Sequence, residues 1–247
     1  MAPWQNGDVL IVTGGSSGIG FGIAGAALRR GRRVVINGRN AQRLDEAARA
    51  LEAPDRVATV PGDVGDPAVA TRLADAAVER FGRLDALVNN AGTFDAKPLA
   101  DYTVEEFDGY VAFLRGAFLV TQAAVERMRS NGGGSIVNIT TNLTTRAISD
   151  IPSSAPIAGK GGVQALTSNL AIELAPDSIR VNAVAPGIVR TPLIDVPDET
   201  LAHLASLHPL GRIGEVDDVG QAVMFLLDAP WITGAILPVD GGLSAGA

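Results

Sequence analysis

The segment Val9-Leu-Ile-Val-Thr-Gly-Gly-Ser-Ser-Gly-Ile-Gly20 decides the fold. Its apolar first part predicts a strand that is buried on both faces, and residues 18–30 predict a helix directly after it. The glycines between them allow a tight turn and a close approach of the backbone to a pyrophosphate. The first turn of the helix offers free N–H groups and a positive dipole end to the same phosphates. The segment therefore predicts a dinucleotide-binding loop inside a βαβ unit.

The alternation of apolar runs and helical patterns continues to the end of the chain. We expect strands at residues 9–13, 33–37, 56–60, 84–89, 135–139, 179–184 and 235–239, and helices at residues 18–30, 41–51, 67–81, 103–129 and 154–174. This α/β pattern predicts a single-domain Rossmann fold over residues 1–247, with a doubly wound parallel seven-stranded sheet and helices on both faces. Residues 187–216 are a long exception that holds three prolines, and we expect them to form a mobile substrate lid.

Composition narrows the classes of function. Apolar residues make up 47% of the 247 residues and charged residues 19%, which suits a packed globular core. The net charge of −7 and the lack of a basic tract argue against nucleic acid and membrane surfaces as partners. The chain has no cysteine, so disulfides and cysteine-ligated metals are excluded. No signal-peptide pattern or membrane span is recognisable, and the expectation is a cytoplasmic protein that acts on a small molecule.

Several motifs together resemble one family. The glycine spacing GxxxGxG is followed by Asp63-Val64, by Asn89-Asn-Ala-Gly92, by Arg180-Val-Asn-Ala-Val-Ala-Pro-Gly187 and by Val239-Asp-Gly-Gly242. In this order and spacing they resemble the short-chain dehydrogenase/reductase family, and the length and tail resemble its 3-oxoacyl-carrier-protein reductase branch most. The resemblance implies a nicotinamide dinucleotide as cofactor. It also implies that the cofactor is bound by Gly14, Ser16, Ser17, Gly18, Ile19, Gly20, Arg39, Asp63, Val64, Asn90, Ala91, Gly92, Lys160, Pro186, Gly187, Ile188 and Thr191.

The end of the second expected strand distinguishes the two nicotinamide dinucleotides. An acidic residue there binds the ribose 2′-hydroxyl of NAD, whereas a cation accepts the 2′-phosphate of NADP. This chain has Gly38 where NAD-binding relatives of that family have aspartate, and Arg39 follows it. The planar guanidinium of arginine pairs well with phosphate. The sequence therefore predicts NADP(H).

The catalytic positions depart from the family's pattern. The resemblance implies an Asn that holds a water, a Ser that orients the carbonyl, a Tyr that acts as general acid, and a Lys that lowers the Tyr pKa and binds ribose. Lys160 matches the lysine, and Thr141 stands in the serine's place with a hydroxyl retained. Phe113 or Leu114, depending on the alignment, falls at the asparagine position. Pro156 replaces the tyrosine four residues before the lysine, where Ser153 or Ser154 is expected to cap the helix.

Lys160 is one of two lysines, beside Lys97, in a chain with 18 arginines. A lysine at this place indicates a compact donor to ribose hydroxyls rather than a general cation. Proline has no proton to give, and a positioned acid contributes roughly 10²–10⁴-fold to such reactions. The sequence thus keeps the cofactor half of the site and changes the proton-delivery half.

Four alternatives remain open at this stage. In the first, the chain is a ketone reductase in which Lys160, a water, His203 or His208 replaces the missing acid. In the second, it reduces an iminium, which needs no acid at oxygen. In the other two, it is a non-redox cyclase, dehydratase or isomerase with NADP(H) as scaffold, or it is a nucleotide-binding pseudoenzyme. Because the cofactor half is intact and the catalytic half is altered, we expect a specialised NADP(H)-dependent oxidoreductase of secondary metabolism.

Other polar groups are candidates for the pocket. The loop of residues 140–154 is about two residues longer than the family pattern implies, and it carries Arg146 and Asp150. Tyr110 lies one helical turn before Phe113, so it either faces the pocket or packs in the core. Residues 103–129 and 154–174 resemble the family's four-helix interface, which implies a homotetramer or a homodimer.

Overall fold

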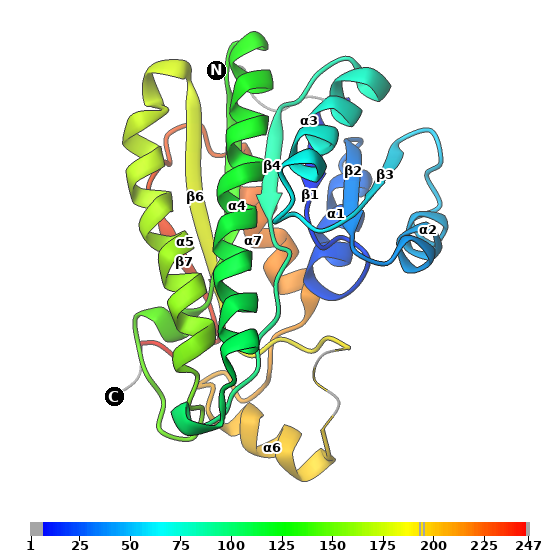
Figure 1. Cartoon of the computed structure of the whole chain (residues 1–247). Coiled ribbons are helices and arrows are strands. Elements are labelled where there is room, and N and C mark those ends of the chain that lie inside the picture. The colour runs from blue at the N-terminus through cyan, green and yellow to red at the C-terminus, as the bar shows by residue number, and fades with distance from the viewer. Residues whose placement is uncertain (1–6, 193, 195, 246–247) are drawn as a thin grey trace.

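The computed structural model describes residues 7–192, 194 and 196–245. Its centre is a parallel sheet of seven strands in the order β3-β2-β1-β4-β5-β6-β7 (Figure 1). The strands are β1 (Val9–Val12), β2 (Arg33–Gly38), β3 (Val57–Pro61), β4 (Ala86–Asn89), β5 (Gly134–Ile139), β6 (Ile179–Pro186) and β7 (Ile236–Val239). The strand order reverses between β1 and β4, where an open α/β sheet offers a crevice for ligands. The predicted fold class is confirmed.

Helices cover both faces of the sheet. One face carries α1 (Gly18–Arg29), α2 (Ala41–Ala50) and α7 (Val216–Asp228), whose apolar side chains pack into one buried cluster. The other face carries α3 (Pro67–Phe81), α4 (Val104–Ser130) and α5 (Ser154–Glu173), which pack into a second cluster. Figure 1 shows α4 and α5 side by side in front of the sheet. In the described part of the chain, no helix has the length and hydropathy needed to cross a membrane.

The ends of the helices follow from local chemistry. The side chain of Asn40 caps α2, and Asp66 caps α3 directly before Pro67. Thr103 and Glu106 form a reciprocal capping box at the start of α4, which satisfies two N–H groups that the helix leaves free. Gly82 ends α3 in the left-handed conformation, with a φ of 83°.

Small residues let α4 and α5 approach closely within one chain. A Cβ at Gly159 would lie 2.5 Å from the carbonyl oxygen of Tyr110, and a Cβ at Gly162 would lie 2.7 Å from the Leu114 side chain. The weak helix formers in α5 are therefore braced by α4 of the same chain.

The chain between the end of β6 and the start of α7, which was expected to form a mobile substrate lid, contains a helix that was not predicted. Residues 198–206 form a short helix, α6 (Asp198–Ser206), and α7 begins at Val216 without having been predicted. Figure 1 shows α6 beyond the edge of the sheet at which the strands end. The two ends of this segment are joined through Gly214, whose N–H donates to the Ile188 carbonyl oxygen and whose carbonyl oxygen accepts from the Arg190 N–H, both at 2.8 Å. The two ends of the segment are therefore held side by side, and its role as a substrate lid stays a prediction.

Candidate active site

The glycine loop after β1 is closed too tightly for side chains. A Cβ at Gly20 would lie 2.3 Å from the carbonyl oxygen of Gly14, and a Cβ at Gly14 would lie 2.8 Å from the Cα of Ala91. Gly18 has a φ of 53°, which favours glycine. Ser17 is the N-cap residue of α1 and its side chain makes no capping bond, so the N–H groups of the first turn remain available. This geometry fits a pyrophosphate at the helix N-terminus.

A set of hydrogen bonds joins this loop to the end of β4. Thr13 Oγ1 accepts from the backbone N–H of Asn90 at 2.9 Å and from that of Ala91 at 3.0 Å. In return, Asn90 Nδ2 donates to the carbonyl oxygens of Thr13 and Gly14 at 3.0 and 3.2 Å. We call this the Thr13–Asn90 clamp. It brings the predicted cofactor residues at 14–20 and 90–92 together at the point where the strand order reverses.

The end of β2 presents a free cation. Arg39 is exposed, and it forms no hydrogen bond or ion pair with any residue that the structure describes. Gly38 is buried, and a Cβ there would lie 3.0 Å from Ser16 Oγ, so the loop leaves little room for a side chain at this position. Past β3, Asp63 is exposed and its Oδ1 accepts from the N–H of Gly65 at 2.8 Å, whereas Val64 is buried.

Lys160 lies at the carboxyl end of β5. Its Nζ donates to the carbonyl oxygens of Thr140 at 3.2 Å and Ile139 at 3.4 Å, and it stands 5.2 Å from the ring centroid of Phe113. Burial lowers the pKa of the Lys160 ammonium from 10.5 to about 8, and no neighbouring carboxylate acts against this. The neighbouring Thr141 is buried, and its Oγ1 accepts from the N–H of Leu143 at 3.4 Å.

The structure distinguishes the two candidates for the asparagine position. The Phe113 ring faces Lys160 and also Gly92, where a Cβ would lie 2.9 Å from the ring. Leu114 points instead at Gly162 of α5. Phe113 is thus the residue beside the lysine, and an aromatic ring there offers no hydrogen bond to an ordered water.

Pro156 is buried in the first turn of α5, one helical turn before Lys160. The N–H groups of the first turn have no partner within a helix, so proline removes no hydrogen bond here. Ser153 occupies the N-cap position as expected, but the expected capping bond is absent. Its Oγ donates to the carbonyl oxygen of Ile151 at 3.0 Å instead. The first bond of the helix runs from the N–H of Ile157 to the Ser153 carbonyl at 3.1 Å.

The base of the lid borders the crevice. Pro186 ends β6, and Thr191 approaches the glycine loop, since a Cβ at Gly18 would lie 3.5 Å from its side chain. His208 is buried; its Nε2 accepts from the N–H of Ile188 at 3.3 Å, and its Nδ1 lies 2.9 Å from the carbonyl oxygen of Leu204. Both ring nitrogens of His208 are therefore engaged in holding the backbone.

The remaining polar candidates do not gather around Lys160. Asp150 and His203 are exposed and lie 3.7 Å apart, between the 140–154 loop and α6. Arg146 is half-buried; its backbone N–H donates to the Asn142 carbonyl oxygen at 3.3 Å, and its guanidinium has no hydrogen bond or ion pair to a described residue. Tyr110 is buried and packs edge-on against Tyr102, with ring centroids 6.2 Å apart. Burial raises the pKa of the Tyr110 phenol.

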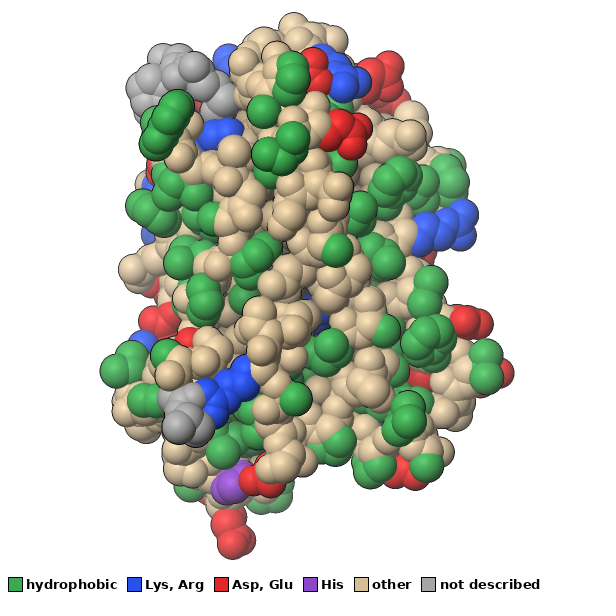
Figure 2. All heavy atoms as spheres, turned by 90° about the vertical axis from the view of Figure 1, so that its left-hand side faces the viewer, with side chains coloured by type: hydrophobic (Ala, Val, Ile, Leu, Met, Phe, Trp, Pro, Cys, Tyr) green, Lys and Arg blue, Asp and Glu red, His purple; other side chains and the backbone are tan. Residues whose placement is uncertain are grey.

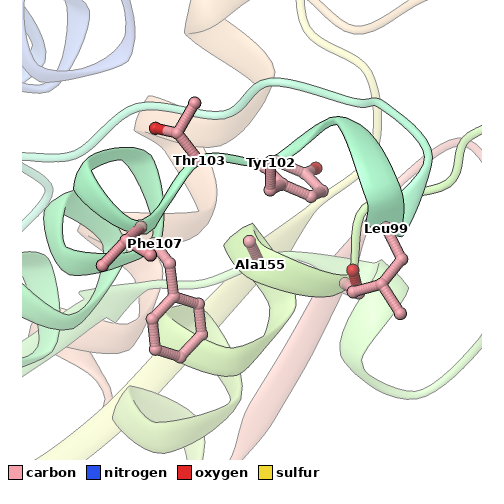
Figure 3. A pocket seen from close by; sticks show the side chains of 7 residues that line it. Leu99, Tyr102, Thr103, Phe107 and Ala155 are labelled. Atoms are coloured by element: carbon pink, nitrogen blue, oxygen red, sulfur yellow. The ribbon is translucent and has the colours of Figure 1, made fainter.

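A polar anchor and a hollow near the site were not predicted from the sequence. Asn142 donates to Asp240 Oδ2 at 3.2 Å, which ties the loop after Thr141 to the tail beyond β7. A hollow of about 280 Å³ lies between the N-terminal ends of α4 and α5 (Figure 3). It is lined mostly by apolar atoms of Leu99, Tyr102, Thr103, Val104, Phe107, Ser154 and Ala155. Among the described residues, no group of three or more His, Asp or Glu side chains could hold a metal ion.

Comparison with known proteins agrees with this geometry. The model of the family described as enoyl-(acyl carrier protein) reductase matches residues 14–244. The chain is 40% identical over 243 residues to the cis-4-hydroxycyclohexanecarboxylate dehydrogenase of Sinomonas cyclohexanicum, with 96% of each chain covered. It is 35% identical over 247 residues to the NADP-dependent (R)-specific alcohol dehydrogenase of Lentilactobacillus kefiri, with 97% of each covered.

Solved structures show the same relationship. A short-chain type dehydrogenase/reductase from Mycobacterium marinum superposes with a TM-score of 0.90 at 29% identity, covering 98% of this chain and 97% of that one. The chain belongs to the short-chain dehydrogenase/reductase family, whose members are oxidoreductases that use nicotinamide cofactors. The matching family model carries a different name from the 3-oxoacyl-carrier-protein reductase branch, so that branch remains a prediction.

The role of the glycine loop in binding the dinucleotide can be tested by one substitution in α1, with a second glycine of the same helix as the control. Gly20→Ala places a Cβ against the Gly14 carbonyl and Asn90 Nδ2, so we expect dinucleotide affinity to fall at least about tenfold. Gly25→Ala places its Cβ no nearer than 3.4 Å to Arg29 and should leave affinity unchanged. Isothermal titration with NADPH measures both, and circular dichroism checks folding. Equal affinity in the two variants contradicts the assigned role of the loop.

Proposed function

We propose that the protein is an NADP(H)-dependent oxidoreductase with an atypical active site that lacks the catalytic tyrosine. Its proposed substrate is a small, specialised ketone, imine or iminium, and we expect a cytoplasmic enzyme of secondary metabolism. One observation carries the proposal: Lys160 stands at the end of β5 without a carboxylate partner, and the residue one turn before it is Pro156. The lysine supports nicotinamide chemistry, while the proline removes the usual source of the proton.

The choice of NADP(H) is supported by the end of β2. Arg39 is exposed and without a partner among the described residues, so it can turn its guanidinium to a 2′-phosphate without breaking another contact. A carboxylate at position 38, which would favour NAD, has little room beside Ser16. The dehydrogenase of Lentilactobacillus kefiri is also described as NADP-dependent.

Replacement of Arg39 tests the cofactor. Arg39→Gln should raise the Kd of NADPH at least about tenfold, because a charge-assisted hydrogen bond contributes roughly 1.5–3 kcal/mol. The Kd of NADH should stay the same, since NADH has no 2′-phosphate. Arg49→Gln, an exposed arginine in the last turn of α2, is the control and should change neither value. A wild-type protein that binds NADH as tightly as NADPH would overturn the proposal.

The chemistry at the substrate is supported by three neighbouring residues. Thr141 keeps a hydroxyl that can donate to a carbonyl oxygen, but a hydroxyl is too weak an acid to replace a phenol. Phe113 leaves no place for the water of a proton relay. Pro156 holds no proton at all. A substrate that is already cationic, such as an iminium, would need none, and this keeps imines beside ketones in the proposal.

Turnover over a panel of substrates tests the function. NADPH oxidation, followed at 340 nm, should proceed on at least one class among ketones, imines and enones. Pro156→Tyr should raise ketone reduction at least about tenfold, because a positioned acid contributes roughly 10²–10⁴-fold. The tyrosine would add a backbone N–H that needs no partner within the helix, because residue 156 lies in its first turn.

The same panel separates the alternatives. Silence on every class with tight NADPH binding retained would favour a non-redox cyclase, dehydratase or isomerase, or a nucleotide-binding pseudoenzyme. Turnover without any gain in Pro156→Tyr would mean that the pocket around Phe113 has been rebuilt as well.

We further propose that the face of α4 and α5 forms an interface with a second copy, in a homotetramer or a homodimer. Exposed apolar side chains follow α4 at helical spacing, namely Val104, Phe107, Val111 and Phe118. They continue into the hollow of Figure 3. Figure 2 views the molecule from the α5 side and shows apolar side chains across this face, with charged ones mainly at its margins. A surface of this kind is typical of protein–protein contacts.

One pair of substitutions tests the interface. Val111→Glu on α4 should lower the mass measured by light scattering at micromolar concentration, because it places a charge in the apolar stripe. Val78→Glu on α3 is the same change at a position of similar exposure, 38% against 44%, and should leave the mass unchanged. A monomeric wild-type protein, or equal masses for both variants, contradicts the interface.

A further inference from the structure

Two buried side chains other than Lys160 could in principle exchange a proton, namely Tyr110 of α4 and His208. The Tyr110 ring packs edge-on against Tyr102, and its phenol also interacts with the backbone of Asp95. His208 uses both ring nitrogens to hold the backbone at Ile188 and Leu204. These groups are committed elsewhere in the structure.

The exposed candidates lie on the lid and its facing loop. His203 and Asp150 are near each other, at 3.7 Å, and exposed on the outer side. Among the described candidates, Lys160 is therefore the titratable side chain that lies at the carboxyl end of β5. Its Nζ donates to the carbonyl oxygen of Thr140, the residue before Thr141, and Lys160 follows Pro156 by one helical turn.

The surroundings of Lys160 allow its ammonium to lose a proton. Its neighbours are two backbone carbonyls from β5 and the Phe113 ring from α4. Carbonyls and an aromatic face stabilise a cation, but they do so less strongly than a carboxylate. No described charged side chain faces it, and burial alone lowers its pKa to about 8. Lys97, in contrast, is paired with Glu106 and Asp95, and the Glu106 hydrogen bond raises its pKa.

We propose that Lys160 is itself the proton donor in carbonyl reduction, and the proton acceptor in alcohol oxidation, in the place that a tyrosine at position 156 would take. This inference rests on the proposed function. NADPH, when bound beside Lys160, would supply the hydride that the carbonyl carbon takes up. The π electron pair of the C=O bond moves to oxygen, an O–H bond forms there, and one N–H bond of the Lys160 ammonium breaks. The neutral amine then regains its proton from water, and Thr141 donates a hydrogen bond to the same oxygen.

The two directions of the reaction depend on pH with opposite signs. Reduction needs the ammonium, so its rate should fall as the pH rises through about 8. Oxidation needs the neutral amine, so its rate should rise over the same interval. No tyrosine at position 156 contributes to either pH profile, because this residue is a proline.

Direct labelling of the amine tests the inference without turnover. Trace acetylation with acetic anhydride between pH 6 and 11, read by peptide mass spectrometry, follows Lys160 and Lys97 separately in the intact protein. Lys160 should react with a midpoint near pH 8, and Lys97 should react at a higher pH than Lys160, since its hydrogen bond with Glu106 raises its pKa. Bound NADP⁺ should protect Lys160 and leave Lys97 unchanged. A midpoint above 10 for Lys160, or no reaction there while Lys97 reacts, overturns the proposal.

Variants connect the amine to catalysis. Lys160→Arg keeps a cation that does not release its proton in this range, so kcat for ketone reduction should fall at least about 100-fold. The change of rate near pH 8 should also disappear from its profile. Lys97→Arg should keep both the rate and the pH profile of the wild type. Turnover in Lys160→Arg with the pH dependence intact contradicts the inference and leaves the proposed function standing, whereas silence of the wild type on the whole panel contradicts the proposed function alone.

Discussion

The Thr13–Asn90 clamp is the constraint on which the site depends. It joins the ends of β1 and β4, the two strands between which the order of the sheet reverses. Because the chain leaves these strands in opposite directions, the crevice between them stays open to a ligand. The clamp fixes how far apart its two walls stand, since one hydroxyl accepts from two backbone N–H groups. Glycines at 14 and 20 are required by the same closeness, because a Cβ at either would meet the opposite backbone or the Asn90 side chain.

The two halves of the site are constrained by different physics. The part proposed to bind the phosphates consists of backbone N–H groups and glycines, whose positions are set by the sheet and by α1. The part proposed to exchange the proton consists of side chains at the end of β5 and in the first turn of α5. A backbone N–H at position 156 has no partner within the helix, so proline and other residues can alternate there without loss of a helical hydrogen bond. The fold therefore requires particular residues in the first part of the site, whereas the residues of the second part can differ without disturbing the fold.

Much of this could be predicted from the sequence, for identifiable reasons. Strands buried on both faces read as continuous apolar runs, and the expected boundaries of all seven lie within two residues of those observed. The helix α6 was missed because residues 187–216 were interpreted as a mobile lid from their prolines, and no helix was assigned over the residues that form α7. The alignment at Phe113 or Leu114 could not be decided, because a one-residue shift on a helix changes which neighbour a side chain meets. The links from His208 to Ile188 and from Asn142 to Asp240 join residues far apart in the chain, and no local pattern indicates them.

The environment of Lys160 follows from the same separation of constraints. An acidic neighbour would raise the pKa of the ammonium, as Glu106 does for Lys97, and would keep the proton on nitrogen. Backbone carbonyls and the Phe113 ring hold the cation in place without that effect, so burial lowers the pKa. Phe113 keeps the lysine in apolar surroundings, and its ring offers no hydrogen bond to an ordered water. Under the proposed mechanism, in which no phenol delivers the proton, these surroundings suit the lysine to exchange a proton near neutral pH.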